Sequence, residues 1–141
     1  MSRYESQKTI AAWGRETFGE THPLVVAARM QVEVAELLEL LAQRSGSSNV
    51  VRVVESLRLS SEALSELVLK HQAEGLLSSV GAAEPGFRAA VEEECADVNI
   101  MLLQVAEAIG GHLDPAVDSK MAINRRRTWS RLPSGRHQHD G

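Results

Sequence analysis

The chain contains 141 residues with a formal net charge of −4 at pH 7, and 43% of its residues are hydrophobic although only 4% are aromatic. This length suits one domain with a proper core, and an abundance of Ala, Leu, Val and Glu favours helix over strand. The negative charge gives no reason to expect nucleic-acid binding, and no apolar run reaches the roughly 18 residues that a membrane span requires.

The cysteine content and the N-terminus indicate the compartment. Cys95 is the only cysteine, so no intrachain disulfide can form, which agrees with a reducing cytoplasm. The first residues show no signal-peptide pattern. We therefore expect a soluble cytoplasmic protein that is not associated with a membrane.

Hydrophobic periodicity predicts five helices joined by short loops. In chain order they cover about residues 4–18, 23–43, 50–77, 87–109 and 115–127. Asn49 and Asp114 are the expected N-caps of the third and fifth helices. Because no β-alternation of useful length occurs, the predicted fold class is all-α, a bundle of about five helices completed by self-association. We assign residues 1–129 to one domain and residues 130–141 to a polar, flexible tail.

Three of these helices carry apolar stripes that we expect to face the core, and the stripe of segment 87–109 includes Phe87, Val98, Met101 and Val105. The stripe of segment 23–43 includes Val26, Met30, Leu37 and Leu40, and that of segment 50–77 includes Val50, Val54, Leu57, Leu64, Leu67 and Val68. The second segment shows no sign of chemistry and is interpreted as scaffold or dimer interface. Apolar residues also occur on other flanks of the long helices, which predicts a homodimer or homotetramer.

Two pairs of acidic residues border apolar stripes at helical spacing. Glu33 and Glu36 form the first acid pair, and Glu94 and Asp97 form the second. Residues three apart are neighbours on a helix, so each pair presents two carboxylates together. Most such pairs lie on solvated faces, but two pairs in the same relation to two stripes favour a metal site. All-oxygen ligands suit Mg²⁺ first and Mn²⁺ as a substitute, and the lack of an E-x-x-H pattern disfavours a di-iron centre.

A basic segment follows the second acid pair. Lys120, Asn124 and Arg127 are spaced four and three apart and share one helix face. A lysine, an amide and an arginine on one stripe can bind phosphate and sugar oxygens. Arg125 and Arg126 are interpreted instead as cations favoured at a helix C-terminus by the macrodipole.

Four segments in this order resemble the MazG-like nucleotide pyrophosphohydrolases of the all-α NTP pyrophosphatase superfamily. They are residues 13–19 (WGRETFG), 33–36 (EVAE), 93–98 (EECADV) and 120–129 (KMAINRRRTW). The resemblance covers most of the chain except residues 50–77. The second acid motif followed by K-M-x-x-N-R is its most specific part.

The resemblance implies a fold, an activity and a site. It implies helical dimers or tetramers that hydrolyse (d)NTP to (d)NMP and pyrophosphate, with a nucleoside triphosphate as substrate and Mg²⁺ as cofactor. Both acid pairs would bind the metal, and Glu33 or Glu36 would position or deprotonate the attacking water. The candidate substrate-binding residues are Lys120, Asn124, Arg127 and Trp13.

Two alternatives remain open at this point. One is a phosphoribosyl-ATP or dCTP-directed pyrophosphohydrolase that shares the site but not the substrate. The other is a non-catalytic helical interaction module in which the acids serve only solubility. The sequence does not distinguish cleansing of the nucleotide pool from a signalling purpose.

Overall fold

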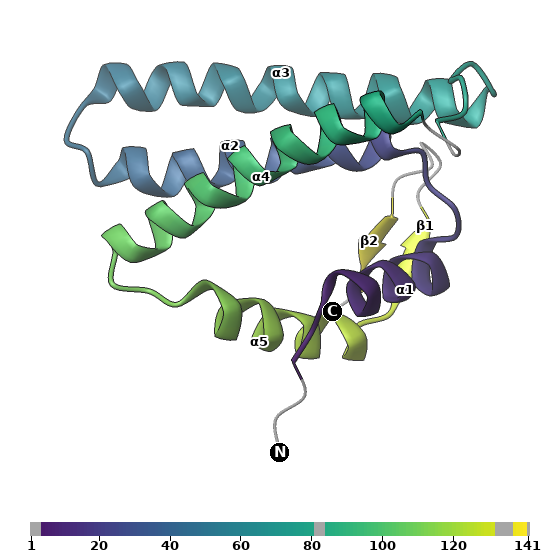
Figure 1. Ribbon diagram of the computed structural model, residues 1–141. Coiled ribbons are helices and arrows are strands. Elements are labelled where there is room, and N and C mark those ends of the chain that lie inside the picture. The colour runs from purple at the N-terminus through teal and green to yellow at the C-terminus, as the bar shows by residue number, and fades with distance from the viewer. Residues whose placement is uncertain (1–3, 81–83, 132–136, 141) are drawn as a thin grey trace. The chain divides into compact units, whose positions relative to one another are not determined.

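A computed structural model describes residues 4–80, 84–131 and 137–140. Within these residues it contains five helices and two short strands, which confirms the predicted all-α class (Figure 1). The elements are α1 (Gln7–Phe18), α2 (Pro23–Gln43), α3 (Ser48–Ala73), α4 (Pro85–Ala108), α5 (Leu113–Arg126), β1 (Trp129–Arg131) and β2 (His137–His139).

The ends of the first two helices follow local capping chemistry. α2 covers the predicted residues, with Pro23 in its first turn. α1 begins later than predicted, because Ser6 and Thr9 form a capping box in which each side-chain oxygen accepts from the other residue's backbone N–H, at 3.3 and 2.8 Å. Gly19 ends α1 with φ of 80°, a conformation that favours glycine. The remaining predicted helices differ from the observed ones by a few residues at their ends.

Both predicted N-caps are wrong. Ser47 caps α3 instead of Asn49, because its extended backbone lets Oγ accept from the N–H of Val50 at 3.3 Å. α5 starts after His112, so that Asp114 lies inside its first turn. There the negative charge of Asp114 favours the helix through the macrodipole rather than through a cap.

A two-stranded antiparallel sheet was not predicted. Trp129 on β1 lies opposite His139 on β2, and their rings make an edge contact with centroids 5.7 Å apart. Strands of three residues are too short to show alternation in the sequence. The sheet falls largely in the predicted tail, of which residues 132–136 and 141 lie outside the described part.

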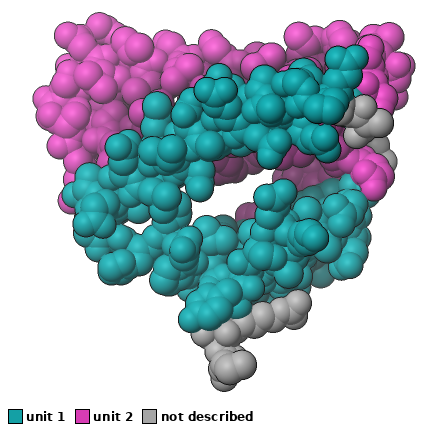
Figure 2. Space-filling model, in the orientation of Figure 1, with its two compact units in different colours: residues 1–19, 80–128, 140–141 teal, residues 20–79, 129–139 magenta. Residues whose placement is uncertain are grey.

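The chain divides into two compact units (Figure 2). Unit 1 comprises residues 1–19, 80–128 and 140–141 and contains α1, α4 and α5. Unit 2 comprises residues 20–79 and 129–139 and contains α2, α3 and the sheet. Each unit carries one of the two acid pairs.

Small side chains form the core of unit 2, where α2 and α3 run antiparallel as a helical hairpin (Figure 1). The buried residues of the two helices are Ala28, Val32, Ala35, Ala42, Val54, Ser61, Ser65 and Val68. Short side chains let two helix axes approach closely. The hydroxyl of Ser61 is satisfied within its own helix, since it donates to the carbonyl of Leu57 at 2.8 Å.

The predicted core stripe of α2 is therefore wrong. Val26, Met30 and Leu40 are 58%, 44% and 67% exposed, although they are the larger apolar residues. Periodicity locates an apolar flank but does not identify the flank that meets the neighbouring helix. On α3 the prediction holds for Val54 and Val68, whereas the other large residues of that stripe, Val50, Leu57, Leu64 and Leu67, remain exposed.

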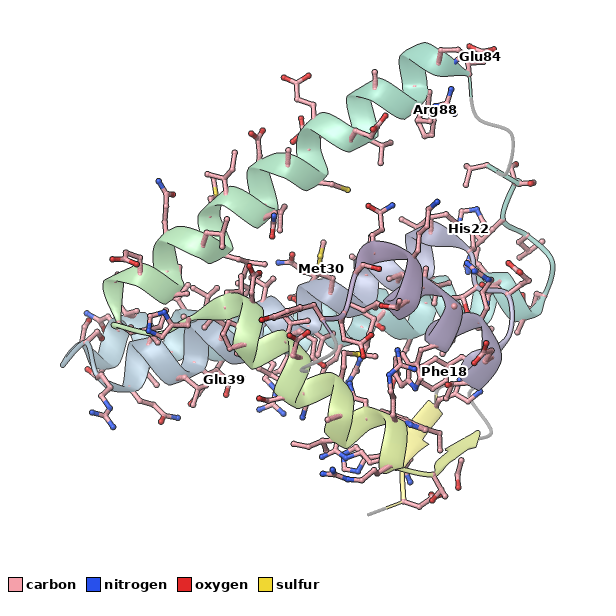
Figure 3. The ribbon with its side chains drawn as sticks, turned by 60° about the horizontal axis from the view of Figure 1, so that its bottom comes forward. Phe18, His22, Met30, Glu39, Glu84 and Arg88 are labelled. Atoms are coloured by element: carbon pink, nitrogen blue, oxygen red, sulfur yellow. The ribbon has the colours of Figure 1, made fainter. Side chains whose placement is uncertain are left out.

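His22 ties the start of α2 to the end of α3 (labelled in Figure 3). Its backbone N–H donates to Oε1 of Gln72 at 2.7 Å, and its Nε2–H donates to the carbonyl of Ser78 at 2.7 Å. Its Nδ1 accepts from the N–H of Leu24 at 3.0 Å, which caps α2. The first two of these bonds join the ends of the hairpin, and the third caps α2 locally.

In unit 1, the segment that leads into α1 lies beside the C-terminal half of α5 (Figure 1). Met121 is the buried residue of α5. No described residue of α4 is buried, so its predicted core stripe is wrong as well: Phe87 and Met101 are 52% and 63% exposed. Within unit 1, α1 and α5 thus leave much of the apolar surface of α4 uncovered.

Candidate functional site

The first acid pair lies on α2 in unit 2. Glu33 is 59% exposed and accepts from Nη2 of Arg29, one turn earlier, at 3.4 Å. The pKa of Glu36 is raised above its usual value of 4.5, first by burial and then by the charge of Glu33 and a side-chain hydrogen bond to it. Arg29 and Arg58 act in the opposite direction and lower that pKa. The charge of Glu33 therefore disfavours ionisation of Glu36, which is a condition that a bound cation relieves.

Glu39 continues the acidic row by one more turn and was not singled out from the sequence. Its Oε2 accepts from Nη1 of Arg58 on α3 at 3.3 Å, and Nε of the same arginine donates to Oε1 of Glu62 at 3.3 Å. The Glu39 side chain is only 22% exposed, and its Oε1 is buried without a hydrogen-bond partner among the described residues. Met30 lies on the side of α2 opposite to Glu39 (Figure 3). Arg58 therefore makes α3 part of the electrostatic surroundings of the first acid pair.

The second acid pair lies on α4 in unit 1. Glu94 and Asp97 are both exposed, and no hydrogen bond or ion pair reaches either carboxylate within the described residues. In those residues, no three His, Cys, Asp or Glu side chains form a group that could hold a metal ion. That all four predicted ligands form one site thus stays a prediction, since the two pairs belong to separate units.

The predicted basic stripe extends to the end of α5. Lys120 is exposed, and Asn124 is half-buried, with Nδ2 3.9 Å from Sδ of Met121. Arg127 lies just beyond the helix, where its backbone N–H donates to the carbonyl of Asn124 at 3.3 Å. Nε of Arg127 is buried without a hydrogen-bond partner among the described residues. Lys120 and Asn124 thus lie one turn apart on α5, whereas Arg127 is the extended C-cap residue beyond the helix, so that all three share one binding face stays a prediction.

Trp13 lines a shallow hollow in unit 1. Its ring makes an edge contact with Phe18, with centroids 5.3 Å apart and planes at 84°. The hollow measures about 290 Å³ and is lined by Lys8, Thr9, Ala12, Trp13, Glu16 and Arg125. An exposed edge of an aromatic ring in such a hollow is a suitable surface for a nucleotide base.

Arg125 has a role that the sequence did not indicate. It forms an ion pair with Glu5, in which its Nη2 is 2.7 Å from Oε1 of Glu5. The residues are 120 positions apart, so no local pattern connects them. The interpretation of Arg125 as a cation at a helix end is therefore incomplete.

These features define an all-α protein with acid pairs on two helices and a basic stripe on a third. Comparison with known sequences finds two phage proteins that are similar over part of the chain. One is a dATP/dGTP diphosphohydrolase of Salmonella phage PMBT28, 54% identical over 46 residues, which are 33% of this chain and 16% of the relative. The other is a dATP/dGTP diphosphohydrolase of Cyanophage S-2L, 38% identical over 64 residues, which are 45% of this chain and 61% of the relative.

The chain thus spans less than two thirds of either relative. No protein-family model and no solved structure matches it. The resemblance to the MazG-like superfamily accordingly stays a prediction. No helix in the described part of the chain has the length and apolarity needed to cross a bilayer.

Proposed function

We propose that this protein is a Mg²⁺-dependent nucleotide pyrophosphohydrolase that converts a purine deoxynucleoside triphosphate to the monophosphate and pyrophosphate. The similarity to two proteins named dATP/dGTP diphosphohydrolase supports the reaction class and the choice of purines. The single observation on this chain that carries the proposal is that Glu33 and Glu36 lie together on α2, where burial and the charge of Glu33 raise the pKa of Glu36.

The donor set fits a hard cation. Carboxylate oxygens are the protein ligands that Mg²⁺ prefers, and Mn²⁺ can replace it in such sites. Glu33 and Glu36 from α2 would hold the ion, together with Glu94 and Asp97 from α4. When bound, Mg²⁺ cancels charge on the triphosphate and acidifies a bound water.

The residues of the chain would then share three tasks. One carboxylate of the first acid pair accepts a proton from the attacking water, which adds to the α-phosphorus in line with the departing pyrophosphate. Lys120 and Arg127 stabilise the negative charge that develops on that leaving group. Asn124 binds phosphate or sugar oxygens, and Trp13 offers a ring for the base.

We also propose that the working protein is a homodimer or homotetramer. The exposed apolar residues of α4 and of the predicted α2 stripe support this proposal. Burial of apolar surface is favourable by about 25 cal/mol for each Å² removed from water, and association would bury these residues. The acid pairs border these surfaces, so that a second copy would also shield them from water.

A panel of nucleotides tests the proposal. The purified protein is incubated with Mg²⁺ and each of the four dNTPs and ATP, and pyrophosphate and orthophosphate are measured separately. We expect pyrophosphate from dATP and dGTP, and none after Glu36→Gln. Orthophosphate as the product would contradict the reaction class, and pyrophosphate mainly from dCTP would replace the purine assignment.

Thermal melting of the same samples distinguishes an enzyme from an interaction module. A ligand that binds the folded state raises the melting temperature by mass action. We expect a rise with Mg²⁺ and a further rise with a nucleotide. No rise with either, together with no activity, would favour the non-catalytic module.

A further inference from the structure

The segment that leads into α1 is fastened to α5 by a two-pronged ion pair, which we call the Glu5–Arg125 latch. Nη2 and Nε of Arg125 donate to Oε1 and Oε2 of Glu5 at 2.7 and 3.0 Å. The Glu5 side chain is only 8% exposed, whereas that of Arg125 is 35% exposed. Two parallel charge-assisted bonds fix the relative orientation of the two groups as well as their separation.

Three further hydrogen bonds surround the latch within unit 1. The backbone N–H of Glu5 donates to Oδ1 of Asp118 at 2.8 Å, so α5 holds this residue at two points about two helical turns apart. Oγ1 of Thr9 donates to Oε1 of Glu5 at 2.9 Å, and Nη2 of Arg125 is 3.4 Å from the carbonyl of Thr9. The latch therefore reaches into the first turns of α1 itself.

On α5 the latched side adjoins the nucleotide side. Asp118, Met121 and Arg125 are spaced three and four apart and form one stripe, which contains the buried residue of the helix. Lys120 and Asn124 each precede a member of this stripe by one residue, and hence lie about 100° around the helix. Fixing the first stripe against α1 thus sets the direction of the second.

On α1 the same latch adjoins Trp13. Thr9 and Trp13 are one turn apart on a single face, and both line the hollow that Arg125 borders. The charge of Glu5 occupies the guanidinium fork, so Arg125 borders the hollow in a fixed position. The latch therefore connects the aromatic wall of the hollow to the helix that carries the phosphate-binding residues.

We propose that Glu5 and Arg125 are positioning residues for the nucleotide: the latch holds Trp13 on α1 in register with Lys120 and Asn124 on α5, so that base and phosphates are bound together. This inference rests on the proposed function. Neither latch residue needs to touch the reacting atoms. The latch acts on how well a nucleotide fits, and hence on KM more than on kcat.

The neighbouring arginine provides a matched control. Arg125→Gln removes the fork, and Arg126→Gln removes the same charge from the same helix end without breaking the latch. We expect Arg125→Gln to raise the KM for the best purine dNTP about tenfold, and Arg126→Gln to change it less than about twofold. Arg125→Lys retains the charge but loses the fork, and should give an intermediate KM. Equal KM values for the Arg125→Gln and Arg126→Gln proteins would overturn the inference.

A double-mutant cycle separates positioning from general stability. If the latch acts through Trp13, breaking it in a Trp13→Ala protein should raise KM no further. A purely structural ion pair would lower affinity by the same factor in both backgrounds, which would refute the inference. If the Arg125→Gln protein melts below the assay temperature, the two residues are exchanged instead, as Glu5→Arg with Arg125→Glu. The exchange keeps an ion pair between the two positions, so its KM should be close to that of the wild type.

Fluorescence distinguishes failure of the inference from failure of the proposed function. In a Trp129→Phe protein all tryptophan emission comes from Trp13, and we expect Arg125→Gln to shift that emission while Arg126→Gln does not. An inactive wild type with this shift would refute the proposed function and still support the latch as the positioner of Trp13. An active wild type with neither the shift nor the change in KM would refute the latch alone.

Discussion

Removing the charge of Glu36 should stabilise the metal-free protein while abolishing its activity. Glu36 and Glu33 are like charges three residues apart on α2, and such a pair destabilises a helix by about 0.2–0.5 kcal/mol. In a domain of this size, about 1 kcal/mol shifts the melting temperature by about 4 °C. We therefore expect Glu36→Gln to raise the metal-free melting temperature by about 1–2 °C. The exposed Glu66→Gln on α3 is the control and should change it little.

Mg²⁺ should reverse this order. At a concentration 100-fold above its dissociation constant, a ligand stabilises the native state by about 2.7 kcal/mol, which corresponds to about 10 °C here. The wild-type and Glu66→Gln proteins should show this rise, whereas the Glu36→Gln protein should show little of it and release no pyrophosphate. Asp97→Asn should behave in the same way if α4 supplies ligands. Retained activity in both acid variants would refute the site, and a large loss of metal-free stability would mark the carboxylates as structural.

The pH dependence of the same comparison follows from the raised pKa of Glu36. The folded chain keeps this proton at a pH where the unfolded chain has lost it, so the stability contributed by the group falls as pH rises from about 4.5 through the folded pKa. The gain from Glu36→Gln should therefore vanish below pH 4.5 and be complete above the folded pKa. Chemical unfolding at a series of pH values measures it, and a gain that grows toward acid pH would contradict the assigned cause.

Three further predictions concern the rest of the molecule. Lys120→Ala should raise KM or lower kcat with a nearly unchanged melting temperature, whereas Lys70→Ala on α3 should change neither KM nor kcat. If the Lys120→Ala and wild-type proteins have the same KM and kcat, Lys120 does not belong to the site. Arg58→Gln should lower the melting temperature more than Arg52→Gln, because it leaves the partly buried Glu39 carboxylate unpaired, and identical melting would show that this ion pair contributes nothing. Sedimentation at micromolar concentration should show a dimer or tetramer, and a monomer would argue against self-association.

Sequence reasoning succeeded where local signals decide the structure. Pro23 and the Ser45–Gly46 turn bracket α2, so its ends could be read from single residues. At α3 two cap-forming residues, Ser47 and Asn49, compete within one turn, and the choice depends on backbone angles that the sequence does not display. The acid pair was found because helical spacing alone makes Glu33 and Glu36 neighbours.

The failures concern contacts between distant segments. Val26 and Leu40 are the larger apolar residues of α2, but the tertiary contact with α3 uses its small residues, and no periodicity reveals that preference. The ion pair of Glu5 with Arg125 joins residues 120 positions apart and has no local signature. Arg58 was overlooked for the same reason, since its carboxylate partner Glu39 lies on another helix.

The small side chains between α2 and α3 limit the substitutions that unit 2 tolerates. Val32 and Ala35 are 1% and 0% exposed, so any added methylene there must push α2 away from α3 or rotate it, at a cost of about 1–3 kcal/mol. A rotation of α2 would also turn Glu33 and Glu36 to a new direction. In a deep mutational scan of the single chain, Ala35→Leu should be rejected more strongly than Leu40→Ser. In this hairpin the buried alanines, rather than the exposed leucines, are therefore the positions expected to tolerate the fewest substitutions.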